Sequence, residues 1–208
     1  MITGEIGRIC GKAVDGIVRL FALSGINPNF LTSIGAVING LAAYLFAIAS
    51  TERPDNTFRW AGVTVILAGI FDLTDGMVAR ITGRVTPFGA FFDSVMDRYS
   101  DLVLLIGLLV FYGRANRFGY VTLVAVAMIG SVMVSYARAR AETLIPSCKV
   151  GFLERPERVV LIIIGALFNR MEAVLWVIAV LSNLTVIHRV VHTRREARRL
   201  APQDPNHI

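Results

Sequence analysis

The chain has 208 residues, of which 55% are hydrophobic and 17% are charged, and its formal net charge is +6. Its apolar residues form long runs, whereas a soluble core uses short alternating segments, so the pattern argues against a soluble globular protein and favours a membrane domain. We expect no soluble second domain in the remaining length. The positive charge would also suit nucleic-acid binding, but basic clusters beside apolar spans are more simply topology signals and contacts for anionic lipid headgroups, so no nucleic-acid partner is expected.

The first 28 residues place charged side chains among apolar ones. This arrangement is typical of an amphipathic helix in the membrane interface and differs from the uninterrupted apolar centre of a cleavable signal peptide. The charged positions are Glu5, Arg8, Lys12, Asp15 and Arg19. We therefore expect residues 1–28 to form a juxtamembrane amphipathic helix.

Six apolar stretches follow, and each is interpreted as a transmembrane helix. A helix that crosses roughly 30 Å of hydrocarbon needs about 20 mostly apolar residues. The stretches cover residues 29–50, 58–82, 88–113, 115–143, 157–170 and 171–193. The fifth is short, and only Asn169 and Arg170 lie between its apolar part and the sixth, so these two should form a tight helical hairpin. The sequence thus predicts an all-α integral membrane protein with six transmembrane helices after the interfacial helix.

Most of the 21 basic residues lie in the N-terminal segment, in the loops after the second and fourth stretches, and in the C-terminal tail. By the positive-inside rule both termini are then cytoplasmic, as expected of a multi-pass protein of the cell membrane. We expect the chain to divide into the helix 1–28, a six-helix transmembrane domain 29–193 and a basic cytoplasmic tail 194–208. Cys10 and Cys148 face the cytoplasm in this topology, so both are predicted to be reduced thiols.

The second and third stretches carry acidic side chains at depths where charge is costly. Asp72 and Asp75 are three residues apart and Asp93 and Asp97 are four apart, so each pair lies on one face of its helix. An unpaired carboxylate at the bilayer centre costs at least about 2.5–3.5 kcal/mol, so several together need a cation or an aqueous cavity. A turn at residues 82–87 would fold the helices into an antiparallel hairpin, in which Asp72 faces Asp97 and Asp75 faces Asp93.

Four converging carboxylates predict a divalent-metal site. An oxygen-only site with no His or Cys nearby selects Mg²⁺ or Mn²⁺ over zinc. Four carboxylates can hold two such ions, an arrangement suited to phosphoryl transfer. Small residues at Gly76, Ala79 and Gly89 leave room for a flat ligand beside the acids, while Arg80 and Arg84 can meet phosphate oxygens. The alternative is a structural ion-pair network or the cation path of a metal-binding membrane transporter.

The same residues read Asp72-x2-Asp75-Gly76-x2-Ala79-Arg80-x8-Gly89-x3-Asp93-x3-Asp97. This pattern resembles the complete signature of the CDP-alcohol phosphotransferases. The resemblance implies a homodimer of six-helix protomers with a two-metal site open to the cytoplasm. It implies that the four aspartates bind the metals and that Asp97 also takes the proton from an alcohol hydroxyl, whose oxygen attacks the lipid-side phosphorus of CDP-diacylglycerol and releases CMP.

The resemblance also implies a nucleotide site. Its residues would be Asn29, Thr32, Asp72, Gly76, Ala79, Arg80 and Gly89. Asn29 and Thr32 belong to the segment Pro28-Asn29-Phe30-Leu31-Thr32 at the start of the first stretch, where a helix N-cap is the alternative interpretation.

A second basic cluster bears on the acceptor alcohol. Arg138 lies about one turn from the end of the fourth stretch, Arg155 opens the fifth helix before Pro156, and Arg189 lies about one turn before the end of the sixth. All three can point inward and form a phosphate-sized pocket beside the metals, although they could instead be snorkelling interface arginines.

The run Arg140-Ala141-Glu142, followed by Gly151-Phe152-Leu153-Glu154-Arg155-Pro156-Glu157-Arg158, resembles the phosphatidylinositol phosphate synthases of actinobacterial type. That resemblance implies inositol 1-phosphate as the acceptor, held at Arg138, Arg155 and Arg189. A glycerol 3-phosphate acceptor, as in phosphatidylglycerol phosphate synthases, is the nearest alternative within the same family.

Overall fold

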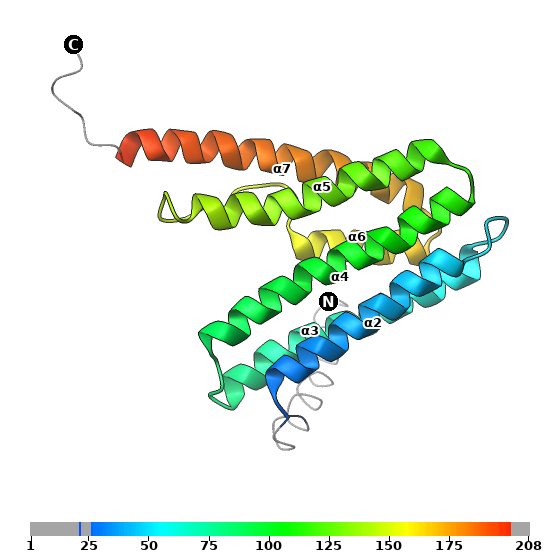
Figure 1. Cartoon of the computed structure of the whole chain (residues 1–208), viewed down its shortest axis with the longest axis horizontal. Helices are drawn as coiled ribbons and strands as arrows, with labels where there is room; N and C mark the ends of the chain where they lie inside the picture. The colour runs from blue at the N-terminus through cyan, green and yellow to red at the C-terminus, as the bar shows by residue number, and fades with distance from the viewer. Residues whose placement is uncertain (1–20, 22–25, 201–208) are drawn as a thin grey trace, which may run out of the picture. The chain divides into compact units, whose positions relative to one another are not determined.

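The computed structural model describes residue 21 and residues 26–200, and this part of the chain contains six α-helices and no strand (Figure 1). The helices are α2 (Pro28–Ile48), α3 (Asp55–Ile81), α4 (Pro87–Arg114), α5 (Phe118–Ala141), α6 (Arg155–Leu167) and α7 (Met171–Leu200). The all-α prediction is confirmed, and each predicted apolar stretch coincides with one helix. The predicted amphipathic helix at residues 1–28 lies almost entirely outside the described residues.

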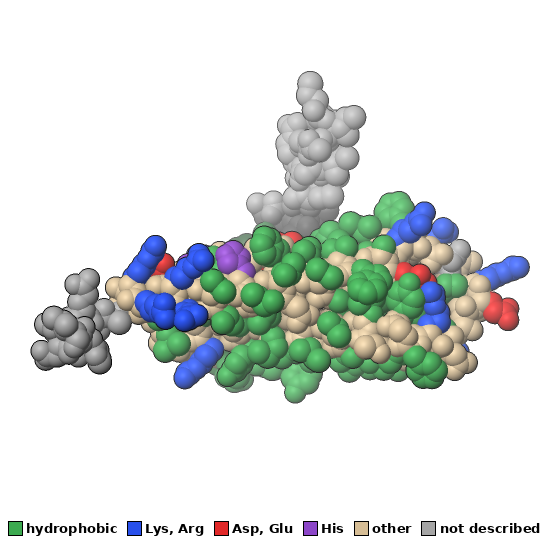
Figure 2. All heavy atoms as spheres, turned by 90° about the horizontal axis from the view of Figure 1, so that it is seen from above, with side chains coloured by type: hydrophobic (Ala, Val, Ile, Leu, Met, Phe, Trp, Pro, Cys, Tyr) green, Lys and Arg blue, Asp and Glu red, His purple; other side chains and the backbone are tan. Residues whose placement is uncertain are grey.

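Four of the described helices are long and apolar enough to cross a membrane, namely α2, α3, α5 and α7. The other two differ for separate reasons. Helix α4 has 28 residues but carries several charged side chains, and α6 has only 13 residues, fewer than a bilayer crossing needs. Exposed hydrophobic side chains are common on the surface seen in Figure 2. On α7 they include Trp176, Val180 and Ile187. The protein is therefore a membrane protein, and crossings by α4 and α6 stay a prediction.

The described residues up to Gly107 form one compact unit, in which α2 packs along α3. Phe46 of α2 and Phe58 of α3 meet edge to face, with ring centroids 5.1 Å apart, and both are buried. A Cβ atom on Gly107 of α4 would lie 2.3 Å from the carbonyl oxygen of Ala43, so the two backbones touch there. Helices α2, α3 and the first part of α4 thus form one packed group.

The predicted turn between the second and third stretches is confirmed, and its geometry follows from its residues. Helix α3 ends in a Schellman motif: Gly83 has a left-handed φ of 66°, and the backbone N–H of Arg84 donates to the carbonyl of Ala79 at 2.9 Å. Helix α4 then starts at Pro87, and the hydroxyl of Thr86 caps it by accepting from the backbone N–H of Gly89, three residues further on, at 3.0 Å.

Residues 108–200 form the second compact unit, in which both α5 and α6 pack against α7. The short connection from α6 to α7 passes through Asn169, which has a left-handed φ of 52°. The predicted tight hairpin of the fifth and sixth stretches is therefore confirmed.

Helix α7 runs further than the predicted end of the sixth stretch at residue 193, because the following residues 194–200 continue the helix. Arg, Glu, Ala and Leu, which make up this segment, are good helix formers. Ala197 also packs against a buried cluster of Ala141, Ile145 and Cys148. Cys148 is a buried free thiol, as predicted, while Cys10 lies outside the described residues.

Candidate active site

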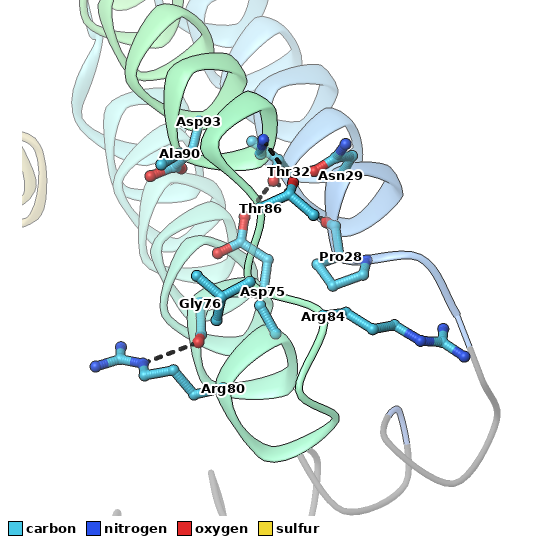
Figure 3. Close-up of a pocket in the computed structure, with 13 residues that line it drawn as sticks. Pro28, Asn29, Thr32, Asp75, Gly76, Arg80, Arg84, Thr86, Ala90 and Asp93 are labelled. Atoms are coloured by element: carbon cyan, nitrogen blue, oxygen red, sulfur yellow. Dashed lines mark hydrogen bonds between the residues drawn. The ribbon is translucent and has the colours of Figure 1, made fainter.

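An open cleft of about 270 Å³ lies in the first unit, where the start of α2, the end of α3 and the start of α4 meet (Figure 3). Its lining consists of Pro28, Asn29, Thr32, Asp75, Gly76, Ala79, Arg80, Arg84, Val85, Thr86, Gly89, Ala90 and Asp93. Most of the residues predicted for the nucleotide and the metals therefore share one cleft. Asp72 and Asp97 are half-buried and are not part of this lining.

Asp75 is the most enclosed acidic side chain of the cleft. It is only 4% exposed, and its carboxylate accepts a hydrogen bond of 2.5 Å from the hydroxyl of Thr32 on α2. The carboxylates of Asp93 and Asp72 both act on it electrostatically. The structure thus brings Asp75 and Asp93 together across the α3–α4 turn, as the predicted antiparallel hairpin requires.

Asp72 lies one turn earlier on α3 and faces the backbone of α2. A Cβ atom placed on Gly35 would be 2.5 Å from the carboxylate oxygen Oδ1 of Asp72 and 3.6 Å from the carbonyl oxygen of Ala68. Only a residue without a side chain leaves that carboxylate in its place. Gly35 was not singled out from the sequence, since nothing in the local pattern marks a glycine in an apolar helix as a neighbour of an acid.

The donor chemistry of the cleft fits a hard divalent cation. Mg²⁺ and Mn²⁺ prefer oxygen ligands. Oxygen ligand atoms are offered here by the side chains of Asp75, Asp93, Asn29 and Thr32. The amide nitrogen of Asn29 is the one other polar atom of these four side chains. Across the described residues, no three His, Cys, Asp or Glu side chains lie close enough together to form a ready-made metal cluster. An ion held by three or more of these aspartates would therefore require their side chains to turn toward it.

The glycines and arginines of the predicted signature lie at the cleft as well. A Cβ atom on Gly89 would be 3.0 Å from the hydroxyl of Thr86 and 3.3 Å from Oδ1 of Asn29, so the absent side chain keeps this wall open. Arg80 donates through Nε to the carbonyl of Gly76 at 3.0 Å. The side chains of Arg80 and Arg84 extend in opposite directions in Figure 3.

The alternative N-cap interpretation of Asn29 and Thr32 is wrong. Asn27 caps α2, because its side-chain oxygen accepts from the backbone N–H of Asn29 at 3.0 Å and its backbone is extended. Pro28 then occupies the first helical turn, which places Thr32 one turn inside the helix. Both predicted residues are thereby free of a capping role and line the cleft.

A second cavity, of about 290 Å³, lies in the other unit. Among the described residues its lining comprises Arg138, Lys149, Val150, Gly151, Phe152, Glu154 and Glu157. Arg138 was predicted for an acceptor pocket, whereas Lys149 was not, because a lysine in a loop without periodicity gives no directional signal. The other two predicted arginines, Arg155 and Arg189, are not in this lining.

Arg189 is almost wholly buried, with 2% of its surface exposed. Its guanidinium donates to the carbonyls of Val150 at 2.8 Å and Val134 at 2.6 Å, and to the carboxylate of Glu154 at 2.7 Å. A snorkelling side chain keeps its charged head in water, so the snorkelling interpretation is wrong for this arginine.

Glu154 joins two of the predicted arginines, because the oxygen that accepts from Arg189 also lies 3.4 Å from the guanidinium of Arg138. Arg138 further donates through Nε to Glu142 at 3.1 Å. This hydrogen bond holds the pKa of the Glu142 carboxyl below its usual range. Arg155 begins α6 directly after Glu154, which forms a capping box with Glu157.

The amino-acid sequence is similar to those of a known protein family and its members. The family model for CDP-alcohol phosphatidyltransferase matches residues 26–190. The chain is 37% identical over 185 residues to archaetidylinositol phosphate synthase from Pyrococcus horikoshii, covering 88% of this chain and 92% of the relative. It is 34% identical over 189 residues to phosphatidylinositol phosphate synthase from Mycobacteroides abscessus, covering 86% and 82% of the two chains.

Solved structures agree with these relatives. The crystal structure of Mycobacterium tuberculosis phosphatidylinositol phosphate synthase with CDP-DAG bound is similar with a TM-score of 0.80 and 26% identity, over 91% of this chain and 98% of the other. A structure of the same enzyme in complex with manganese and citrate also gives a TM-score of 0.80, with 26% identity, over 90% and 92%. With the family model covering most of the chain and most of the signature residues lining one cleft, the protein belongs to the CDP-alcohol phosphatidyltransferase family.

Proposed function

We propose that the protein transfers the phosphatidyl group of CDP-diacylglycerol to a hydroxyl of inositol 1-phosphate, giving phosphatidylinositol phosphate and CMP. One observation carries this proposal: residues from α2, α3 and α4 that match the family signature line a single open cleft. The names of the relatives add the acceptor. They differ in their lipid part, archaetidyl or phosphatidyl, and agree in the inositol phosphate part.

The cleft would hold the nucleotide end of the lipid donor. Asn29 and Thr32 come from one side, and Gly76, Ala79 and Gly89 provide surface with little side-chain bulk. Arg80 stands at the edge with an exposed guanidinium that can meet a phosphate oxygen. Asp72 completes this proposed nucleotide set, although it lies against Gly35 instead of in the lining.

Asp72, Asp75, Asp93 and Asp97 would hold two Mg²⁺ or Mn²⁺ ions. Bound there, such ions would supply positive charge to the phosphates of the donor. Support comes from the oxygen donors of the cleft and from the related enzyme whose structure was determined in complex with manganese and citrate. Thr32 orients Asp75 through their 2.5 Å hydrogen bond, which fixes one carboxylate oxygen.

Asp97 would act as the general base. It lies one helical turn after Asp93 on the same face of α4 and is half-buried. It would accept the proton of the acceptor hydroxyl while the hydroxyl oxygen forms a bond to the lipid-side phosphorus. The bond from this phosphorus to the oxygen of CMP then breaks, and CMP leaves with the bonding electron pair. The step needs no covalent enzyme intermediate.

Arg138, Arg155 and Arg189 would hold the phosphate of the acceptor. The buried guanidinium of Arg189 and the half-buried one of Arg138 are already linked by Glu154, and Arg155 is the next residue in the chain. A cluster of guanidinium groups suits an anionic acceptor and would be superfluous for a neutral alcohol.

The proposal includes a setting for the enzyme. We infer six membrane crossings, cytoplasmic termini and a cytoplasmic active site in the cell membrane, and a homodimer as the working form. The four apolar helices support the membrane location. The basic residues Arg194, Arg195, Arg198 and Arg199 at the end of α7 support a cytoplasmic C-terminus.

The test is release of CMP by the purified protein in the presence of CDP-diacylglycerol and Mn²⁺. Inositol 1-phosphate should support release, while glycerol 3-phosphate and unphosphorylated inositol should not, and an Asp97→Asn variant serves as the inactive control. Release with glycerol 3-phosphate alone would instead identify a phosphatidylglycerol phosphate synthase. Absence of release with every acceptor would refute the proposal and favour the transporter alternative.

A further inference from the structure

The connection from α5 to α6, residues 142–154, has no helix or strand, yet it provides most of the lining of the second cavity. Lys149, Val150, Gly151, Phe152 and Glu154 all belong to it. A loop of this length has many conformations, and fixing it takes specific contacts with the rest of the unit. Those contacts decide where the charged residues of the cavity lie.

Thr185 of α7 makes one such contact, and its hydroxyl uses all of its hydrogen-bonding capacity. The oxygen accepts from the backbone N–H of Phe152 at 3.0 Å and from that of Leu153 at 3.2 Å. It donates to the carbonyl of Leu181 in its own helix at 2.7 Å. A hydroxyl has one hydrogen and two lone pairs, so this one is fully used, and the side chain is 0% exposed.

Gly151 makes the approach to Thr185 sterically feasible. Its φ is +145°, which side-chain-bearing residues rarely adopt, and a Cβ atom there would lie 2.4 Å from the methyl carbon Cγ2 of Thr185. The backbone of the loop at residues 151–153 therefore packs directly against the side chain of Thr185. Lys149 and Val150 come just before this contact in the chain, and Glu154 and Arg155 come just after it.

We propose that Thr185 is a positioning residue for the acceptor site, which fixes the loop and thereby the cationic groups around it without touching the acceptor itself. This inference rests on the proposed function, since it takes the second cavity as the place of the phosphorylated acceptor. Removing the hydroxyl leaves two backbone N–H groups without their acceptor, that of Leu153 buried and that of Phe152 partly buried, so the loop would move to regain partners. Residues that hold the lipid donor and the metals lie in the other unit and should not respond.

The experiment compares Thr185→Val, which keeps the shape and removes the hydroxyl, with Thr185→Ser, which keeps the hydroxyl. Thr193→Val is the matched control, because among the described residues the Thr193 hydroxyl bonds only a carbonyl of its own helix, that of Arg189 at 2.7 Å. Thr185→Val should raise the KM for inositol 1-phosphate about tenfold, equivalent to about 1.4 kcal/mol, with a change below about twofold in the KM for CDP-diacylglycerol. Thr185→Ser and Thr193→Val should both stay within about twofold of the parent protein.

Equal increases of both KM values, or an unchanged KM for inositol 1-phosphate, would overturn the inference. Retained Mn²⁺ and CDP-diacylglycerol binding shows that a variant is folded. If Thr185→Val does not fold, Gly151→Ala carries the same test from the loop side and must give the same split. If the parent protein uses glycerol 3-phosphate instead, the proposed function fails, and the inference is judged by the KM for that acceptor. An inactive parent protein refutes both.

Discussion

Replacing Gly35 by alanine should disrupt the proposed metal site through a residue that is not itself a proposed ligand. The added Cβ atom would lie 2.5 Å from Oδ1 of Asp72. A carbon and an oxygen atom in contact are normally about 3.3 Å apart, so the carboxylate must withdraw by roughly 0.8 Å or rotate away. The other nearby atom, the carbonyl oxygen of Ala68 at 3.6 Å, is in ordinary contact and needs no shift.

If Asp72 holds an ion from its place beside Gly35 while the other aspartates turn toward that ion, a displacement of this size exceeds what a metal ligand tolerates, because metal–ligand distances are held within about 0.2 Å. Changes to residues that orient metal ligands typically weaken metal binding about 10–100-fold. We therefore expect Gly35→Ala to weaken Mn²⁺ binding by about that factor, or about 1.4–2.7 kcal/mol. The change should not weaken the helix itself, since alanine in a helix interior is more favourable than glycine by roughly 0.5–1 kcal/mol.

Gly40→Ala is the matched control, since it lies in the same helix and a Cβ atom there would meet nothing within 4 Å. Mn²⁺ binding to both variants and to the parent protein can be followed by electron paramagnetic resonance in detergent, with the Mn²⁺ dependence of CMP release as a second readout. Gly40→Ala should match the parent protein in both. A Gly35→Ala protein that binds Mn²⁺ within about twofold of the Gly40→Ala protein would refute the assignment of Asp72 as a metal ligand.

Three further variants test other parts of the site. Asp97→Asn should abolish turnover while CDP-diacylglycerol binding stays largely intact, and unchanged turnover would remove Asp97 as the base. Arg155→Gln should raise the KM for the phosphorylated acceptor far more than that for the lipid, whereas equal effects would make this arginine an anchor. Thr32→Val removes the donor to Asp75 and should raise the Mn²⁺ concentration for half-maximal activity about tenfold. Thr32→Ser keeps the hydroxyl and should need the same Mn²⁺ concentration as the parent protein.

The parts of the site that could be predicted from the sequence are those set by helical periodicity and by a tight turn. Asp75 and Asp93 could be paired because the turn residues Gly83 and Pro87 fix where α3 ends and α4 begins, so counting back from the turn gives the register. Both aspartates line the same cleft, as this register requires. Whether Asp72 faces Asp97 in the same way, and which ions the four acids hold, stay predictions.

The parts that could not be predicted depend on contacts between distant segments. The sequence shows that Arg189 is a cation about one turn from the predicted end of a helix. It does not show that the guanidinium of Arg189 donates hydrogen bonds to the carbonyls of Val134 and Val150. Gly35 and Thr185 look like ordinary small residues of apolar helices. Their importance comes from an acid on the neighbouring helix and from a loop 32 or more residues away, and no local pattern encodes either distance.

The two cavities handle buried charge in different ways, and this difference bears on what each can bind. In the second unit, Arg138 and Arg189 share the carboxylate of Glu154, so opposite charges within the protein lower the cost of burying them. An acceptor phosphate would compete with that carboxylate for the same guanidinium groups. In the first unit, the donor to Asp75 is the neutral hydroxyl of Thr32, which orients the carboxylate without neutralising it, while Asp72 and Asp93 add like charge. The first cleft is therefore suited to a divalent cation, whereas an acceptor phosphate in the second unit would have to displace Glu154 from Arg138 and Arg189 before it could bind to them.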